Sequence, residues 1–531
     1  MTPPAIAITA DTAAPGTPLA HFWSTCVGAG RAAEGLRATW LEHLSTVASA
    51  AGFRYVRFHG LLHDDMFVHR RDPETGRVIH NFQYVDDLFD RILDTGVRPF
   101  VEFAFSPPDL AREKGTTFWW KANGAPPTDL TEWADLIRAL TEHWIARYGI
   151  DEVRAWYFEV WNEPNLGPFF RGSRSEYFEL YAVTARTLKE VDPELRVGGP
   201  ATSNFVPDGR FAGEHEDTSQ HAVVAQAEDL DALDWRPVWV AEFLAYCHEN
   251  AVPVDFVSCH PYPTDWALDG HGTTQQYTRA ADATTRDLLT LRRIVEASPF
   301  PRAEIHLTEW NSSPSSRDHT HDHLPAATFV VKANLESIGL TDSLAYWTFT
   351  DVFEEQGAGD TAFHGGFGMI NYQGVPKPVF HAYRMMHQLG DQLLERTEGA
   401  VATRDSATGA LSVLAYHYPP EVWLAPPGSF GGRETVEGLL ATGAPRRLRA
   451  ELTGLRPGAS VTVEILDAAH GNAMAAWAGL GSPEPLSRDH VAQLRKAGHE
   501  VGLVVRSADD EGRFVFDEDL TPWSVVLLRE V

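Results

Sequence analysis

The stretch Trp156-Tyr-Phe-Glu-Val-Trp-Asn-Glu-Pro-Asn165 begins as a β-strand and ends in an acidic side chain. The aromatic and β-branched residues up to Trp161 favour a strand, and Pro164 with Asn165 ends it. A carboxylate at the end of a buried strand costs free energy unless it is hydrogen-bonded or has a function. Taken alone, Glu163 could equally be a surface residue at an ordinary turn, so the rest of the chain has to decide.

Strand-like runs alternate with helical patterns on both sides of this stretch. The strand-like runs are 21–27, 55–59, 98–105, 156–163, 196–201, 255–262, 304–311 and 343–350. The helical patterns are 33–51, 85–95, 130–148, 175–191, 238–250, 274–297 and 326–338. Eight strand-like runs alternating with helices predict an α/β protein with a closed (β/α)₈ TIM barrel. The alternative is an open doubly wound sheet, but Val27-Gly-Ala-Gly30 is too short a match to its Gly-rich phosphate turn.

The pattern changes after residue 388. Short alternating runs follow, several of them separated by turn clusters such as Pro426-Pro-Gly428, and a small helix is expected near 487–497. This arrangement is typical of a β-sandwich. We therefore predict an N-terminal arm (1–18) in which residues 6–9 could add a strand to a neighbouring sheet such as the sandwich, a catalytic barrel (19–388) and a C-terminal β-sandwich accessory domain (389–531).

Composition narrows the function classes. The chain has 531 residues, of which 44% are hydrophobic and 22% charged, as in soluble globular proteins. Its formal net charge of −29 argues against nucleic acid and anionic membranes as partners. Three cysteines are too few for a disulfide framework, and no signal-peptide pattern or long apolar segment is present. We expect a cytoplasmic protein.

Polar and aromatic side chains recur where the predicted strands end. Because barrels of this type carry out chemistry at the C-terminal ends of their strands, we expect these side chains to face one pocket. They are His59, Asn162, Glu163, His260, Tyr262, Glu309 and Trp347.

Two carboxylic acids on the fourth and seventh strands are what retaining glycoside hydrolysis requires. One must donate a proton to the leaving oxygen, and the other must attack the anomeric carbon. We assign Glu163 as the general acid/base and Glu309 as the nucleophile, and Asn162 could bind the sugar 2-hydroxyl. Retention predicts carboxyl groups about 5–5.5 Å apart, against roughly 6.5–9.5 Å for inversion. The alternative is that either glutamate forms a structural salt bridge.

Several sequence blocks carry a family resemblance. Trp161-Asn-Glu-Pro164 and Leu307-Thr-Glu-Trp-Asn311 resemble the glycoside hydrolases that have both acids on strands four and seven. The blocks at 21–23, 53–60, 347–355, 363–368 and 377–383 are similar to family 39 β-xylosidases, so the resemblance covers about 20–388. It implies a barrel with an accessory β-sandwich, catalysis by Glu163 and Glu309, no cofactor or metal, and often a tetramer. The sugar contacts that it implies are His59, Asn162, His260, Tyr262, Trp347 and Glu354.

The loop after the eighth strand bears on the sugar. Glu354 and Glu355 lie in it, and no Lys or Arg occurs from Trp347 to Gly368. Carboxylates accept hydrogen bonds from hydroxyls but repel a substrate carboxylate, so a neutral pentose fits better than the uronic acid of the family's α-L-iduronidases. We therefore expect an exo-acting retaining enzyme that releases β-D-xylose from xylo-oligosaccharides or β-xylosides. The alternatives are an arabinoside, glucoside, galactoside or iduronide substrate, or a non-catalytic sugar-binding protein.

The segment His319-Thr-His-Asp-His323 raises the question of a metal site, because alternating histidines can chelate. In a loop, however, such histidines are more often solvated or line a pocket, and we favour that interpretation. We expect loops 203–250 and 312–325 to border the pocket.

Overall fold

The structure is a computed structural model, and it describes residues 4–206, 213–215, 234–268, 274–422 and 432–531. The predicted turn Pro426-Pro-Gly428 lies outside these residues. Within the described parts, no helix is long and apolar enough to cross a membrane. The three cysteines are buried and unpaired.

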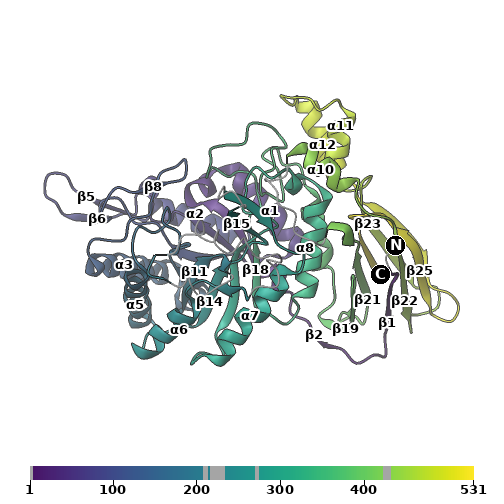
Figure 1. Cartoon of the computed structure of the whole chain (residues 1–531), viewed down its shortest axis with the longest axis horizontal. Helices are drawn as coiled ribbons and strands as arrows, with labels where there is room; N and C mark the ends of the chain where they lie inside the picture. The colour runs from purple at the N-terminus through teal and green to yellow at the C-terminus, as the bar shows by residue number, and fades with distance from the viewer. Residues whose placement is uncertain (1–3, 207–212, 216–233, 269–273, 423–431) are drawn as a thin grey trace.

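The first and larger part of the chain forms a closed parallel barrel surrounded by helices, which confirms the predicted fold class (Figure 1). Its strands in order around the barrel are β3 (Cys26–Arg31), β4 (Tyr55–His59), β7 (Arg98–Phe103), β10 (Tyr157–Val160), β11 (Arg196–Ser203), β14 (Phe256–His260), β17 (Glu304–Trp310) and β18 (Ser343–Tyr346). The main helices are α1 (Ala38–Ala51), α2 (Gln83–Asp94), α3 (Leu130–Tyr148), α5 (Arg174–Val191), α6 (Val240–Glu249), α7 (Ala283–Ala297), α8 (Leu324–Glu336) and α9 (Pro378–His387).

Local signals in the sequence explain where these helices begin. The Asp129 side chain accepts hydrogen bonds from the amides of Thr131 and Glu132 and so caps α3. Ser173 and Glu176 form a reciprocal capping box at the start of α5. Both caps satisfy amides that would otherwise lack partners at the helix N-terminus.

Several predicted elements have other bounds in the structure. The helix predicted at 33–51 begins at Ala38, after a 3₁₀ segment (Ala32–Leu36), and the strand predicted at 343–350 ends at Tyr346. The first strand begins at Cys26 instead of residue 21, because Phe22–Ser24 forms a buried 3₁₀ turn. The helix predicted from residue 274 begins at Ala283. The preceding segment β16 (Thr274–Thr278) pairs with β15 (Thr264–Leu268), in keeping with the high β-propensity of Thr and Tyr.

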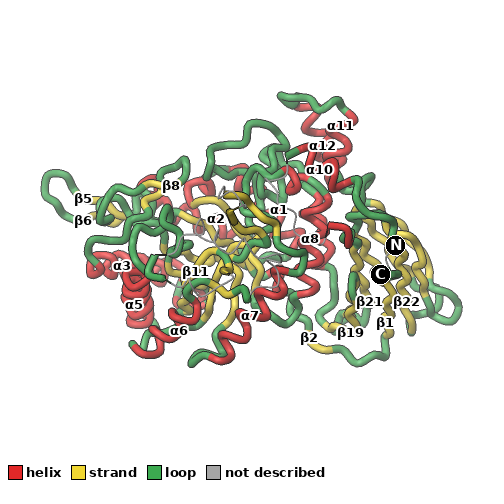
Figure 2. The backbone as a smooth tube through the Cα atoms, in the orientation of Figure 1, coloured by secondary structure: helices red, strands yellow, loops and turns green. Residues whose placement is uncertain are grey.

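The C-terminal part is a β-sandwich that includes the start of the chain (Figure 2). One sheet has the order β2 (Thr17–Pro18), β19 (Gln392–Thr397), β20 (Ala400–Arg404), β21 (Leu411–Tyr416), β26 (Val525–Glu530), β23 (Ser460–Leu466) and β24 (Gly502–Ser507). The other consists of β1 (Ile6–Asp11), β22 (Arg446–Thr453) and β25 (Phe514–Leu520). β1 runs parallel to β22, with Ile6 opposite Leu448. The small helix expected near 487–497 is α12 (Arg488–His499).

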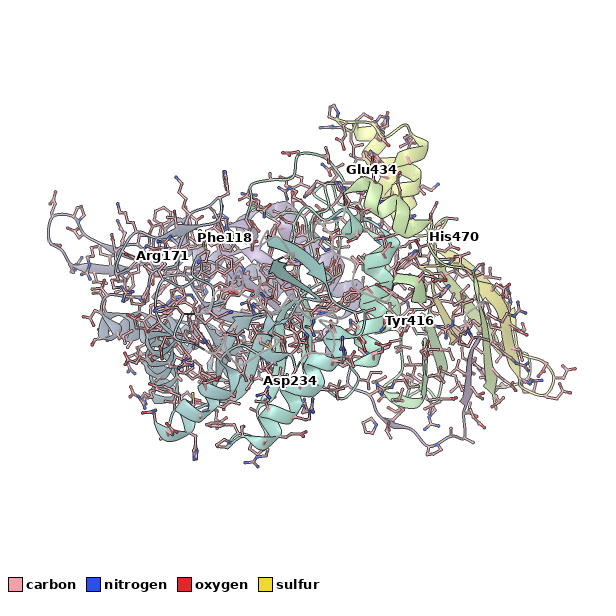
Figure 3. All side chains as sticks on the ribbon, viewed as in Figure 1. Phe118, Arg171, Asp234, Tyr416, Glu434 and His470 are labelled. Atoms are coloured by element: carbon pink, nitrogen blue, oxygen red, sulfur yellow. The ribbon has the colours of Figure 1, made fainter. Side chains whose placement is uncertain are left out.

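The sandwich packs directly on the barrel through α8 and α9. Tyr416, labelled in Figure 3, belongs to β21, and its hydroxyl donates a hydrogen bond to Glu336 of α8 (3.1 Å). Thr328 of α8 donates to the carbonyl of Trp523 (2.8 Å). Trp523 and Tyr416 also belong to the hydrophobic core of the barrel, so one core continues across both domains.

A buried lysine anchors the loop that follows β18. Lys377 Nζ lies 2.8 Å from Asp322 Oδ1, 2.7 Å from Asp351 Oδ2 and 2.8 Å from the carbonyl of Gly366, and the three charged side chains are inaccessible to solvent. Asp351 and Gly366 belong to the loop between β18 and α9, whereas Asp322 precedes α8. The three charges therefore hold this loop against the barrel.

We expect the Lys377→Met substitution to lower the free energy of unfolding by about 3–5 kcal/mol, because it leaves two buried carboxylates without their cation. Burial opposes ionisation of Asp322, but Lys377 outweighs burial and lowers its pKa. The Asp322 contribution to stability is therefore present above the ordinary carboxyl pKa and is lost as the pH falls through the folded-state value. Urea unfolding at pH 7 measures the loss. The variant K377M/D322N/D351N is the control, and it should recover much of the lost free energy of unfolding because it leaves no unpaired buried carboxylate at this position. If both variants are equally unstable, the explanation is contradicted.

Candidate active site

A cavity of about 170 Å³ opens at the C-terminal ends of the barrel strands. Its walls combine acids, aromatic rings and small polar residues, a composition suited to a sugar. Phe118, labelled in Figure 3, comes from the loops on this side of the barrel. The cavity is lined by His59, Phe118, Asn162, Glu163, Leu166, Phe169, Ser203, Asn204, Tyr262, Glu309, Pro314, Trp347, Glu355 and Phe367.

Glu163 lies on a tight turn directly after β10. Trp161 and Glu163 both have left-handed backbones, with φ of 74° and 47°. Such conformations are costly for non-glycine residues and are found where function requires a side chain to be directed. The amide of Glu163 donates to the carbonyl of Ala201 (2.8 Å), which fixes the turn to β11. The turn residues Pro164 and Asn165, which mark the end of the strand in the sequence, thus follow a carboxylate that lines the cavity.

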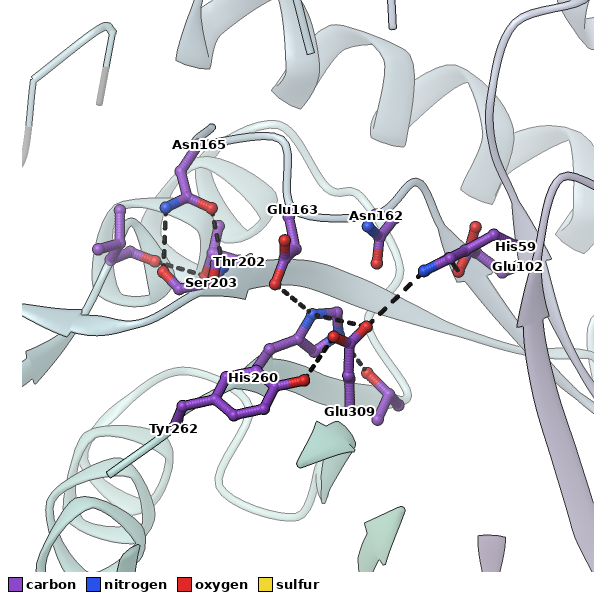
Figure 4. Close-up of polar contacts among 12 residues, drawn as sticks. His59, Glu102, Asn162, Glu163, Asn165, Thr202, Ser203, His260, Tyr262 and Glu309 are labelled. Atoms are coloured by element: carbon purple, nitrogen blue, oxygen red, sulfur yellow. Dashed lines mark hydrogen bonds and ion pairs between the residues drawn. The ribbon is translucent and has the colours of Figure 1, made fainter. Parts of the chain in front are cut away.

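Glu309 lies in β17 and contacts hydrogen-bond donors and cations, of which Figure 4 shows Tyr262 and His59. The Tyr262 hydroxyl donates to Glu309 Oε1 (2.6 Å), and Arg57 Nη1 donates to Oε2 (3.4 Å). His59 Nε2 lies 3.8 Å from Oε2. These contacts stabilise the ionised form of Glu309.

The two carboxyl groups face each other across His260. One oxygen of Glu163, one oxygen of Glu309 and one imidazole nitrogen of His260 all lie within 4.8 Å of one another. His260 Nδ1 is 3.1 Å from Glu163 Oε1 (Figure 4). This is the only group of His, Cys, Asp and Glu side chains among the described residues that is close enough to hold a metal ion. The two carboxyl groups of this cluster are also the kind of pair that glycoside hydrolysis needs.

The two glutamates differ in their surroundings and therefore in their protonation. Burial raises the pKa of Glu163 to about 7. Burial and the charge of Glu163 likewise raise the pKa of Glu309 to about 7, so the pKa values alone do not distinguish the two. Since two carboxylates this close do not both ionise readily, the first charge goes to the one with more donors, which is Glu309. We therefore expect the site to hold one proton at neutral pH, and we expect it on Glu163.

Arg57 lies below the cavity and contacts several of the acidic and polar side chains of the site. It is not among the residues that the sequence predicted. Its guanidinium donates to Glu159 Oε2 (2.7 Å) and to Asn162 Oδ1 (2.8 Å), and it pairs with Glu102 (2.9 Å). Arg57, Glu102 and Glu159 are fully buried. A signal was available, because each is a charged residue in the middle of an apolar strand, and Arg57 shares the face of β4 with His59.

The other predicted residues fall around the same pocket, with two exceptions. His260, predicted as a sugar contact, is fully buried behind the wall and contacts Glu163 and Thr308 instead of lining the cavity. His59 Nδ1 donates to the Glu102 carboxylate (2.7 Å); burial alone would lower the pKa of His59, but Glu102 raises it to about 10. Trp347 lies against His59, with ring centroids 4.8 Å apart. Glu354 does not line the cavity, because its carboxylate pairs with Arg31 (3.0 Å) and Arg37 (2.7 Å). Its neighbour Glu355 occupies that place, 3.6 Å from His59 Nε2.

Gly28 of β3 leaves the space that Trp347 fills. A Cβ atom at this position would lie 2.4 Å from Cε3 of the Trp347 ring. We expect Gly28→Ala to displace Trp347 and to weaken substrate binding, since overpacking a core typically costs about 1–3 kcal/mol. The measurement is KM for an aryl glycoside. Gly438→Ala is the control, because Gly438 lies in helix α10 (Arg433–Leu440) and nothing lies within 4 Å of a Cβ at that position. An unchanged KM in G28A would show that Trp347 does not contact the sugar.

The remaining expectations concern loops. Among the described residues, His319, His321 and His323 belong to no group of side chains close enough to hold a metal ion. His321 Nδ1 lies 3.1 Å from the carbonyl oxygen of Gly365. Of loop 203–250, Ser203 and Asn204 line the cavity, and residues 207–212 and 216–233 lie outside the described parts. Pro314 is the contribution of loop 312–325.

Comparisons with known proteins agree with this geometry. The model of glycosyl hydrolases family 39 matches residues 6–220 and 231–515. A β-xylosidase of Geobacillus stearothermophilus is 36% identical over 495 residues, covering 92% of this chain and 88% of its own. The crystal structures of a family 39 enzyme from Xanthomonas axonopodis pv. citri (TM-score 0.84) and of a monomeric β-xylosidase from Caulobacter crescentus CB15 (TM-score 0.83) are each 31% identical to it. They cover 100% and 99% of this chain, and 98% and 99% of their own chains. The chain is therefore a glycoside hydrolase that belongs to family 39.

Proposed function

We propose that this protein is a retaining exo-β-D-xylosidase that releases xylose from the non-reducing end of xylo-oligosaccharides or β-xylosides. The observation that carries the proposal is the pair Glu163 and Glu309, with an oxygen of each within 4.8 Å of the other. This approach favours the roughly 5–5.5 Å carboxyl separation of retaining enzymes over the roughly 6.5–9.5 Å with which inverting enzymes accommodate a water molecule. The β-xylosidase activity of the similar proteins supports the choice of sugar.

The reaction follows from the protonation of the pair. Glu309 attacks the anomeric carbon as the glycosidic bond breaks, and Glu163 transfers its proton to the leaving oxygen. In the second step, the Glu163 carboxylate takes a proton from a water molecule that attacks the anomeric carbon and releases Glu309. Asn162, held by Arg57 (2.8 Å), is positioned to bind the sugar 2-hydroxyl.

The size and charge of the cavity support an exo-acting enzyme for a neutral sugar. Its volume of about 170 Å³ is well below the roughly 300–1,000 Å³ of pockets for drug-sized ligands, so it suits one sugar residue. Glu355 adds a third carboxylate to the wall. The nearby cations Arg57 and His59 are already paired with Glu102. A uronic acid would have to compete with these carboxylates.

The test compares chromogenic β-xyloside with the corresponding arabinoside, glucoside, galactoside and iduronide. We expect kcat/KM to be highest for the xyloside, and NMR of the first sugar released from the aryl β-xyloside to show β-xylose before mutarotation. Release of α-xylose would rule out retention. Higher kcat/KM on another glycoside would change the substrate, and absence of turnover on all of them would favour a sugar-binding protein.

A further inference from the structure

His260 connects the proposed acid to the interior of the barrel. Its ring is fully buried, with Nδ1 3.1 Å from Glu163 Oε1 and Nε2 2.9 Å from the hydroxyl of Thr308. Burial lowers the pKa of His260 to about 4, so the ring is neutral and carries one N–H. Which nitrogen carries it decides whether Glu163 meets a donor or a lone pair.

Thr308 decides this point because a hydroxyl has a single proton. Thr308 Oγ1 donates to Glu159 Oε1 (2.7 Å). Glu159 is an acceptor only, since Arg57 donates to its other oxygen (2.7 Å) and, although burial opposes it, Arg57 lowers the pKa of Glu159. With its proton directed at Glu159, Thr308 must accept the hydrogen bond from His260. The N–H of His260 is therefore on Nε2, and Nδ1 presents a lone pair.

We propose that Glu159, Thr308 and His260 form a hydrogen-bond chain that holds Glu163 in its protonated form, with Thr308 as the positioning residue. A lone pair at Nδ1 makes a hydrogen bond with Glu163 only if Glu163 supplies the proton. The proposal rests on the proposed role of Glu163 as the acid. It adds the reason why this glutamate, and not Glu309, keeps the proton before the substrate binds.

The chain also serves the second half of the reaction. Once Glu163 has given its proton to the leaving group, its carboxylate faces the lone pair of His260. The carboxylate form is then disfavoured, which strengthens Glu163 as the base that takes a proton from water.

Other charged groups face the same carboxyl and act alongside the chain. Burial raises the pKa of Glu163, a hydrogen bond from Ser203 and the charges of His59 and Arg57 lower it, and Glu102 raises it. Burial and the charge of Glu163 in turn raise the pKa values of Glu309 and Glu355. None of these groups contacts Thr308 through a hydrogen bond among the described residues, so a change at Thr308 tests the chain separately.

The variant Thr308→Val removes the hydroxyl while keeping the shape of the side chain. His260 can then place its proton on Nδ1 and donate to the Glu163 carboxylate, which lowers the pKa of Glu163. We expect the alkaline limb of kcat/KM for xylobiose to move about one unit to lower pH. Hydrolysis of 2,4-dinitrophenyl β-xyloside should change much less, because its leaving group needs no proton. Thr308→Ser keeps the hydroxyl and should hold the limb at its wild-type position.

Three results would overturn the proposal. The alkaline limb of kcat/KM in T308V could stay at its wild-type pH, kcat/KM could fall equally on xylobiose and on 2,4-dinitrophenyl β-xyloside, or T308S could behave like T308V. Neutron diffraction of the wild-type protein tests it without any variant. Deuterium should be found on His260 Nε2 and on Glu163, and none on Nδ1; deuterium on Nδ1 would refute the chain. If the wild-type protein hydrolyses no β-xyloside, the proposed function fails, whereas the neutron result still decides the hydrogen bonding.

Discussion

In the Glu309→Ala variant, hydrolysis of an aryl β-xyloside is expected to fall by on the order of 10⁴–10⁶-fold, as when other enzymes lose their nucleophile. Alanine leaves no group able to form the covalent sugar intermediate. The fold should survive, because Arg57 keeps its contacts with Glu102 and Glu159 (2.9 and 2.7 Å). Circular dichroism and thermal unfolding check the fold, and initial rates on 2,4-dinitrophenyl β-xyloside check the loss.

Azide identifies the role of the missing carboxylate. In E309A it can enter from the face that Glu309 occupied, so we expect partial recovery of turnover with α-xylosyl azide as the product. The matched control is Glu163→Ala, in which azide attacks the covalent intermediate and gives the β-azide. If E309A yields the β-azide, or retains more than a few per cent of wild-type activity, the assignment of the two glutamates is reversed or wrong.

The Glu163→Gln variant should lose about 10²–10⁴-fold in kcat/KM on xylobiose, the usual contribution of a general acid. Loss on 2,4-dinitrophenyl β-xyloside should be far smaller, since that leaving group departs unprotonated. The pH profile gives a second measurement. Burial raises the pKa of Glu163 to about 7, so in the wild-type protein the acid is present below this pH and activity on xylobiose falls as the pH rises through it. The variant should lack this alkaline limb.

Glutamine is the suitable replacement because it keeps the size of the side chain, and its amide nitrogen can donate to His260 Nδ1, which lies 3.1 Å from Glu163 Oε1. Glu355→Gln serves as the control, since Glu355 lines the same cavity but is not the proposed acid. It should change KM and still show an alkaline limb in the pH profile, which E163Q should lack. Similar losses on both substrates in E163Q would exclude an acid role for Glu163.

The sequence predicts the barrel well because its signals are local. Alternating strands and helices follow from hydrophobic periodicity, and polar residues after apolar runs indicate strand ends that face solvent or a pocket. Glu163, with Pro164 directly behind it, is the clearest example, and the structure places it on the cavity wall. The closed barrel then brings His59 and Glu309 to the same end of the fold, although 250 positions separate them in the chain.

Contacts between distant segments explain what the sequence did not reveal. Nothing local distinguishes Glu354 from Glu355; Arg31 and Arg37, more than 300 positions earlier, bind the first and leave the second at the cavity. Arg57 was missed for a related reason. A buried guanidinium is stable only with the carboxylates of two other strands, Glu102 and Glu159, and that pairing exists only once the barrel closes.

The pairing of β1 with β22 has a consequence for synthesis of the protein. The strand beginning at Ile6 leaves the ribosome early, but its neighbour around Leu448 is made 442 residues later. At about 5–20 residues per second, that interval is roughly 20–90 s. Throughout it the barrel can fold, whereas an apolar β-segment made before the barrel has no native partner. The domain that is completed after the barrel thus includes a strand that is translated before it.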